Sequence, residues 1–192
     1  ELFRRWVVSD KKILELEKAT KQAELQQLKK QINPHFLFNM LNNANILVKD
    51  APDEASQILE KLDNLLRYQL NDSTRREVFL TADIQFLTSF LELEKVRRDH
   101  FEYTIFQEGN MENICIPPLL FIPFVENAVK HNLDSDNLSY VHLYFSVHNK
   151  QLTFRCENSK PRVPVKREGG IGLANVKRRL DLLYESRYTL QI

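Results

Sequence analysis

The sequence predicts an α+β fold in two parts, a helical hairpin followed by a domain in which helices pack against a sheet. Two observations lead to this prediction. Residues 10–70 carry apolar side chains at steps of mainly three and four, which is typical of helices with one buried face. After Val78, segments with alternating apolar residues predict strands between further helices. Hydrophobic residues make up 43% of the chain, which is enough for a folded core.

The first part begins with residues 10–49, which predict one long helix or two consecutive helices because glycine is absent and helix formers dominate. Their apolar stripe suits a partner helix or a coiled coil. Either Pro34 kinks a continuous helix, or Asn33 caps a new helix that begins with Pro34. After a turn at residues 50–53, a second amphipathic helix is expected, with an apolar face formed by Ile58, Leu59, Leu62, Leu65, Leu66 and Leu70. A two-helix hairpin cannot bury both faces, so we expect it to dimerise into a four-helix bundle.

The polar residues 71–76 predict a linker to the second part. Thr81 is expected to cap a helix that ends near Arg98. The remaining elements are predicted in this order: a strand over 101–107, a helix opened by Pro117-Pro118 and ending near residue 132, strands over 141–147 and 152–156 joined by a turn at Asn149-Lys150, a helix over 173–183, and the start of a strand over 188–192. Helices set against one sheet in this order predict an α/β sandwich.

Charge, cysteines and hydropathy exclude several classes of protein. The net charge of +1 gives no general argument for nucleic-acid binding. Cys115 and Cys156 are far apart and show no CxxC spacing, which argues against a disulfide framework or a zinc site and favours a reducing cytoplasm. Because the sequence lacks a run of about 18 apolar residues, no segment is expected to span a membrane.

One motif that could take part in a reaction is Asn-Pro-His-Phe-Leu-Phe-Asn at residues 33–39. A neutral imidazole at His35 can act as a nucleophile, and the amide of Asn39, one helical turn later, could orient a water or a phosphate. Taken alone, the motif is more typical of a helical histidine that has no chemistry.

Three further clusters point to a phosphate ligand. Residues 126–132 place Glu126, Asn127 and Lys130 on adjacent faces of a helix, where oxygen ligands suit Mg²⁺ and an ammonium group suits phosphate. An intrahelical salt bridge is the alternative. Residues 169–173 hold three of the four glycines directly before a helix, as in phosphate-binding loops, or as in a flexible loop. Residues 160–179 carry seven Lys and Arg against one acid, which favours a polyanion but also fits nucleic acid or a solvated surface.

The order of these motifs is more specific than any of them. NPHFLFN on a helical hairpin, then PFVENAVKHN, then GGIGLANVKRRL resembles the LytS-type sensor histidine kinases, from about residue 20 to the C-terminus. The resemblance implies a hairpin that dimerises and carries the phosphoacceptor histidine, followed by a GHKL-type ATP-binding α/β sandwich. It divides the chain into a signalling helix at 1–32, the hairpin at 33–72 and a C-terminally truncated ATP-binding domain at 73–192.

By this resemblance His35 is the phosphoacceptor, and Asn39 could support a phosphatase activity. Asn127 would bind Mg²⁺, and Glu126 would order the waters of the metal. The other nucleotide-binding residues would be Lys130, His131, Glu157, Asn158, Gly170, Gly172 and Asn175.

The sequence departs from the common pattern at three places. Phe36 follows the histidine where many histidine kinases have an acid, so the general base is not identified. Glu157-Asn158-Ser159 replaces the usual Asp-x-Gly at the adenine site, and Glu168 replaces the first glycine of the glycine box.

The resemblance also implies cofactors, partners and location. We expect Mg²⁺ and ATP, a homodimer, and a response-regulator receiver domain as phosphoryl acceptor, with no nucleic acid. The chain would be the cytoplasmic domain of an inner-membrane protein, attached through upstream segments. Two alternatives stay open: a GHKL ATPase without phosphorelay, and a dimeric adaptor with a degenerate adenine site.

Overall fold

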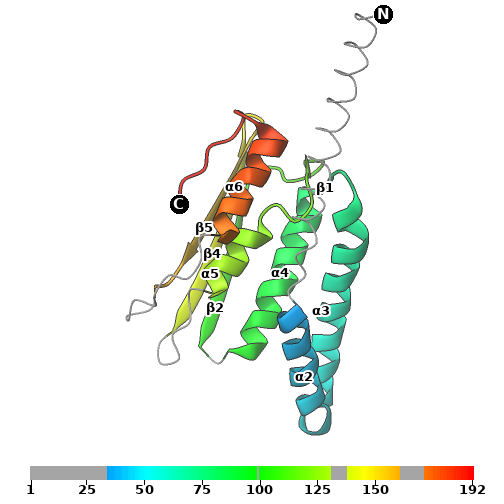
Figure 1. Cartoon of the computed structure of the whole chain (residues 1–192). Helices are drawn as coiled ribbons and strands as arrows, with labels where there is room; N and C mark the ends of the chain where they lie inside the picture. Colours follow the sequence, from blue (N-terminus) through cyan, green and yellow to red (C-terminus); the bar gives the residue numbers. More distant parts are fainter. Residues whose placement is uncertain (1–33, 99, 131–137, 161–170) are drawn as a thin grey trace, which may run out of the picture. The chain divides into compact units, whose positions relative to one another are not determined.

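The computed structural model describes residues 34–98, 100–130, 138–160 and 171–192 (Figure 1). The chain divides into two units, which are described separately: residues 33–168, and residues 1–32 together with 169–192. None of the described helices combines the length and hydrophobicity needed to cross a lipid bilayer. The part of the predicted helical segment 10–49 that precedes Pro34 lies outside the described residues, and so does the choice between a kink at Pro34 and a cap at Asn33.

The predicted hairpin is formed by α2 (Pro34–Asp50) and α3 (Pro52–Asn71), which are joined by Ala51 alone. Pro52 opens α3, and two acids in its first turn favour this helix end. The face of α3 that is buried consists of Ala55, Ile58, Leu62, Leu65 and Tyr68. The predicted apolar face was therefore wrong at its edges: Leu59 and Leu70 are 45% and 62% exposed, because each is turned away from this stripe.

The chain then forms two small sheets. The elements after the hairpin are η1 (Asp72–Thr74), β1 (Val78–Phe79), α4 (Leu80–Arg97), β2 (Phe101–Glu108), β3 (Cys115–Ile116), α5 (Ile122–Lys130), β4 (Ser139–His148) and β5 (Gln151–Asn158). One sheet has the order β2-β4-β5, with β2 parallel and β5 antiparallel to β4; β1 and β3 form a separate antiparallel pair. The predicted turn at Asn149-Lys150 is confirmed, and both residues have positive φ, as a tight hairpin turn requires.

The core of this unit has α4 at its centre. Helix α4 contacts α3 on one side and β2 on the other, so it lies between the hairpin and the sheet (Figure 1). The ring of Phe90 packs against that of Phe36 in α2, with centroids 5.0 Å apart, and Phe86 stacks on Tyr68 at 4.7 Å. Because α4 is covered on two sides, its buried residues lie on more than one face and include Phe86 and Phe90 as well as Leu87.

Two predicted helix starts were wrong. Thr81 does not cap α4, which begins at Leu80; there the Leu80 N–H donates to the Ile114 carbonyl at 2.8 Å, so the β1–β3 pair takes the place of a side-chain cap. Pro117-Pro118 does not open α5, which begins at Ile122. The intervening turn contains Leu119 at φ 56°, a left-handed conformation that cannot continue a helix.

The second unit is described only by α6 (Ile171–Tyr184) and the residues after it. The chain leaves α6 at Glu185, which has φ 53°, and the Tyr188 hydroxyl donates to Asp181 Oδ1 at 2.5 Å. The predicted start of a strand over 188–192 was wrong for this structure. These residues pair with none of the described strands, and a strand requires a neighbouring strand for its backbone hydrogen bonds.

Candidate functional site

Helix α5, which carries Glu126, Asn127 and Lys130, is held to α4 near both ends. Ahead of its first turn, the Leu119 N–H donates to Asp83 Oδ1 at 3.0 Å. Near its last turn, Arg98 Nη1 donates to the Val129 carbonyl at 3.2 Å. Helix α4 is therefore the frame that positions α5.

The side chains of α5 divide into a buried face and a partly solvated one. Its apolar face, formed by Ile122, Val125, Ala128 and Val129, is buried. Glu126 and Asn127 are half-buried and Lys130 is exposed. The helix thus brings three predicted site residues together, at the spacing that the sequence indicates; His131 lies outside the described residues.

The carboxyl of Glu126 is electrostatically unusual. Burial is the main cause that raises its pKa from 4.5 to about 7, and the charge of Glu94 raises it further. Glu94 is itself only 3% exposed and pairs with Arg97 Nη2 at 2.6 Å and with Arg98 Nε at 3.1 Å. A carboxyl that changes charge near neutral pH can accept a proton or order the water of a bound cation.

The composition of this site fits a magnesium ion. Mg²⁺ keeps most of its waters and needs only one or two protein ligands, so a cluster of three or more His, Cys, Asp or Glu side chains, which the described residues lack, is not required. Glu126 and Asn127 offer a carboxylate and an amide oxygen on one helix. A cation would also offset the unfavourable proximity of Glu126 to the charge of Glu94.

The two candidate adenine-site residues lie on opposite faces of β5, because side chains alternate along a strand. Asn158 shares its face with Phe154. The ring of Phe154 contacts that of Phe121, directly before α5, and that of Phe124 in α5, with centroids 4.5 and 5.8 Å apart. Glu157 is exposed on the other face and lies 3.4 Å from Arg155 Nε. The side-chain amide of Asn158 donates from Nδ2 to the Ser159 carbonyl at 2.8 Å, which leaves the amide oxygen to act as an acceptor.

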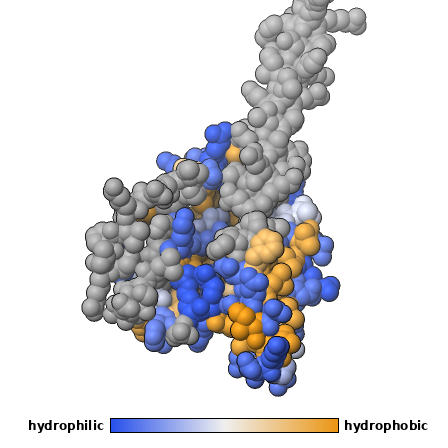
Figure 2. Space-filling model, turned by 60° about the horizontal axis from the view of Figure 1, so that its bottom comes forward, coloured by the Kyte–Doolittle hydropathy of each residue, from blue (hydrophilic) through white to orange (hydrophobic). Residues whose placement is uncertain are grey.

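The predicted phosphoacceptor lies at the start of the described part of α2. The backbone of His35 is helical, and its side chain lies outside the described residues. Asn39, one turn later, is half-buried. Large apolar side chains on this helix face solvent, and Figure 2 shows the hydrophobic surface over the hairpin; they are Phe38, Leu41, Ile46 and Val48, between 47% and 69% exposed.

The described glycine-box residues do not belong to the same unit as α5. Gly170 lies outside the described residues, and Gly172 and Asn175 lie on α6, in the other unit. Of the basic residues predicted to face a polyanion, those at 161–170 also lie outside the described residues.

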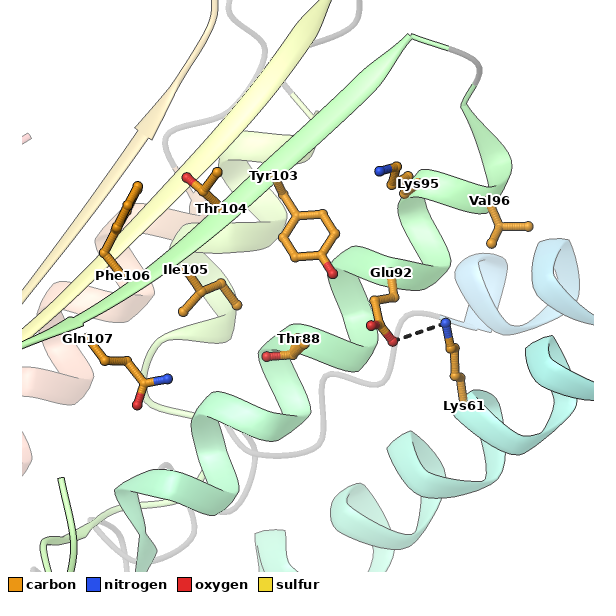
Figure 3. Close-up of a pocket in the computed structure, with 10 residues that line it drawn as sticks. All are labelled: Lys61, Thr88, Glu92, Lys95, Val96, Tyr103, Thr104, Ile105, Phe106 and Gln107. Carbon is orange, nitrogen blue, oxygen red and sulfur yellow. Dashed lines mark ion pairs between the residues drawn. The ribbon is translucent and has the colours of Figure 1, made fainter.

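A groove of about 890 Å³ between α3, α4 and β2 contains none of the predicted site residues. In Figure 3, Lys61 of α3 points toward Glu92 of α4, and their Nζ and Oε2 atoms are 3.1 Å apart. Tyr103 of β2 also faces this pair, and its pKa is raised by burial, by the charge of Glu92 and by a hydrogen bond to it. The groove therefore lies between the hairpin helix α3 and strand β2 of the sheet, away from the predicted site residues.

The sequence reading missed three residues in α4 or directly after it that support the site. Asp83, Glu94 and Arg98 hold or influence α5, yet none belongs to a predicted motif. Glu94 and Arg98 stand four residues apart with opposite charges, which was a signal for an ion pair on one helix. Nothing in the sequence marked Asp83.

Comparison with known proteins connects this geometry to a family. Residues 23–101, which include the hairpin and α4, match the family model for histidine kinases. "Sensor protein LytS" of Staphylococcus haemolyticus is 30% identical over 188 residues, covering 90% of this chain and 32% of the relative. The resemblance to LytS-type sensor histidine kinases is confirmed.

Other relatives agree in kind. "Sensor histidine kinase YpdA" of Escherichia coli is 32% identical over 62% of this chain and 21% of its own length. "Sensor histidine kinase/phosphatase LytS" of Staphylococcus aureus is 33% identical over 59% of this chain and 20% of its own length. The chain therefore spans a fifth to a third of the length of these relatives.

Among solved structures, the histidine kinase domain of the Erythrobacter litoralis EL346 blue-light activated kinase aligns with a TM-score of 0.43 at 16% identity, covering 85% of this chain and 82% of that one. A likeness this distant carries no argument about the present chain.

Proposed function

We propose that this chain uses ATP with Mg²⁺ to phosphorylate His35, and that the phosphoryl group then passes to an aspartate of a response-regulator receiver domain. The observation that carries the proposal is the histidine kinase match over residues 23–101, because it spans the hairpin in which His35 lies. Helix α5, with Glu126 and Asn127 beside each other, supports the nucleotide-binding half of the proposal.

The nucleotide would bind along α5 and the end of β5. Asn127 would hold the metal through its amide oxygen, and Glu126 would accept hydrogen bonds from metal-bound water. Lys130, exposed at the end of α5, would contribute positive charge toward the phosphates. Asn158 supports an adenine contact better than Glu157 does, because it lies on the α5 side of the sheet. His131, Gly170, Gly172 and Asn175 complete the proposed set.

The chemical step places most of its demands on positioning. A neutral imidazole of His35 forms a bond to the γ-phosphorus while the bond to the departing ADP oxygen breaks. Bound Mg²⁺ supplies charge neutralisation during this transfer. The proton on the attacking ring must leave, and Phe36 cannot accept it, so the base lies elsewhere.

The hairpin would dimerise into a four-helix bundle. The exposed apolar residues of α2, together with Leu59 and Leu70 of α3, give it a second apolar surface besides the one that packs on α4. The proposed division keeps residues 1–32 as a signalling helix, 33–72 as the hairpin and 73–192 as the ATP-binding domain. In the whole protein, upstream segments would attach this cytoplasmic part to the inner membrane.

A phosphatase activity toward the regulator is a second candidate function. It is favoured by Asn39, half-buried one turn after His35, and by a relative whose name includes both activities. Its amide could orient a water against a phosphorylated aspartate. Regulator dephosphorylation that is unchanged in Asn39→Ala would contradict this role.

The proposal is tested by incubating the chain with γ-labelled ATP and Mg²⁺ beside His35→Gln and Asn127→Ala. We expect acid-labile label on the unmodified chain, none on His35→Gln, and loss of both label and nucleotide binding in Asn127→Ala. ATP hydrolysis that continues without label would favour the ATPase alternative. Absence of nucleotide binding in the unmodified chain would favour the adaptor.

A further inference from the structure

A buried carboxylate joins the hairpin to the segment that leads into α5. Asp83, in the first turn of α4, has no exposed surface. Its Oδ1 atom accepts a hydrogen bond from the Tyr68 hydroxyl of α3 at 2.6 Å and another from the Leu119 N–H at 3.0 Å. Two segments separated by about fifty residues therefore share one oxygen atom of one side chain.

The Tyr68 end of this junction belongs to the docked hairpin. Tyr68 is 6% exposed and its ring stacks on Phe86 of α4. Burial and the charge of Asp83 raise the pKa of its hydroxyl, whereas a backbone hydrogen bond from Leu119 acts in the opposite direction. The phenol is thus a neutral donor that lies close to both Asp83 and Leu119.

The Leu119 end of the junction is conformationally costly. Leu119 is buried and has φ 56°, a left-handed conformation that a leucine rarely adopts unless its surroundings hold it there. The hydrogen bond from the Leu119 N–H to Asp83 Oδ1 holds the backbone at this position. Leu119 precedes the first residue of α5 by three positions, and Glu126 lies one turn further.

The other end of α5 is held from the C-terminal end of α4. Arg98 holds the Val129 carbonyl, and Arg98 is paired with Glu94 of α4 itself. A change in hairpin docking would therefore act on the N-terminal end of α5 more than on its C-terminal end.

We propose that Asp83 is a positioning residue that transmits docking of the hairpin to the N-terminal end of α5, and through it to nucleotide binding. The effect on nucleotide binding rests on the nucleotide site proposed above. The effect of hairpin docking on α5 does not rest on that site, and the two effects are tested separately.

Tyr68→Phe removes one hydroxyl and keeps the stacked ring, so the fold is retained. Tyr103→Phe is the matched control, because its hydroxyl also meets a carboxylate of α4, Glu92, but on the side of the groove in Figure 3. We would measure the rate of hydrogen–deuterium exchange of the backbone amides of residues 119–126 without nucleotide. The exchange rate of the central strand β4 serves as the internal reference. The Phe124 and Val125 amides donate to the Phe121 carbonyl there, at 3.0 and 3.3 Å, and report on the start of α5.

We expect Tyr68→Phe to speed exchange of residues 119–126 about tenfold relative to β4, the size of effect of one hydrogen bond, with little change in Tyr103→Phe. Faster exchange confined to the hairpin would overturn the proposal. So would equal effects of the two variants, since these would reflect general destabilisation.

The nucleotide half is read from the dissociation constant of ADP with Mg²⁺. We expect it to rise several-fold in Tyr68→Phe and to stay unchanged in Tyr103→Phe, following the reciprocity of linked equilibria. An unchanged constant beside faster exchange would overturn the transmission to the nucleotide site. If the unmodified chain binds no nucleotide, the proposed function fails, while the exchange result still decides whether Asp83 links the hairpin to α5.

Discussion

The unusual carboxyl of Glu126 predicts a specific pH dependence of stability. Its pKa is raised from 4.5 to about 7 in the folded chain, first by burial and then by Glu94. Below pH 4.5 the group is protonated in both states. Between pH 4.5 and about 7 the unfolded chain releases the proton and the folded chain retains it, so the free energy of unfolding falls as pH rises. Above that range the loss is complete.

The size of this loss follows from the same two values. At about 1.4 kcal/mol for each tenfold change in proton activity, the interval from 4.5 to about 7 corresponds to at most about 3.5 kcal/mol. Partial exposure of the side chain makes this an upper value. Glu126→Gln has no proton to lose, so its stability relative to the unmodified chain should improve by up to about this amount between pH 5 and pH 8.

Urea unfolding at intervals across this range measures the effect. Glu60→Gln, at an exposed position of α3, is the matched control, and its difference from the unmodified chain should stay constant. Parallel pH profiles for Glu126→Gln and the unmodified chain would contradict this prediction, because they would mean that Glu126 ionises equally easily in the folded and unfolded states.

Two further predictions concern the proposed interfaces of the chain. Ile46 is 69% exposed, so Ile46→Glu should leave the melting temperature nearly unchanged. It should shift the chain from dimer to monomer in sedimentation, because it places a charge in the proposed bundle. A dimer of unaltered strength would argue against the bundle. Asn158→Ala should weaken ATP binding about tenfold in a calorimetric titration, which is the size of one lost hydrogen bond. Glu157→Ala should change ATP binding little. The reverse order of effects would place the adenine contact on the other face of β5.

Local patterns in the sequence were sufficient where neighbouring residues decide the structure. The step of three and four predicted α3, and the polar pair Asn149-Lys150 predicted the turn between β4 and β5. The spacing of Glu126, Asn127 and Lys130 likewise placed all three on one helix. In each case the determining interactions lie within a few residues along the chain.

Prediction failed where distant segments decide. Thr81 has the chemistry of a helix cap, but α4 begins two residues earlier than this cap would require, directly after the β1 strand that pairs with β3. Prolines suggested an early start for α5, but Leu119 turns left-handed and bonds to Asp83, 36 positions away. The altered pKa of Glu126 also depends on Glu94, in another helix. Such contacts become visible only when the fold is known.

The central claim is that His35 receives the phosphoryl group of ATP. Cleavage after Lys30 and Lys49 yields a peptide of residues 31–49 that contains His35 and no Ser, Thr, Tyr, Asp or Glu. We would incubate the chain with ATP and Mg²⁺, digest it at neutral pH and fragment this peptide in a mass spectrometer. We expect a phosphate on the His35 imidazole. An unmodified peptide from a chain that binds ATP, or phosphate found only on other peptides, would contradict it.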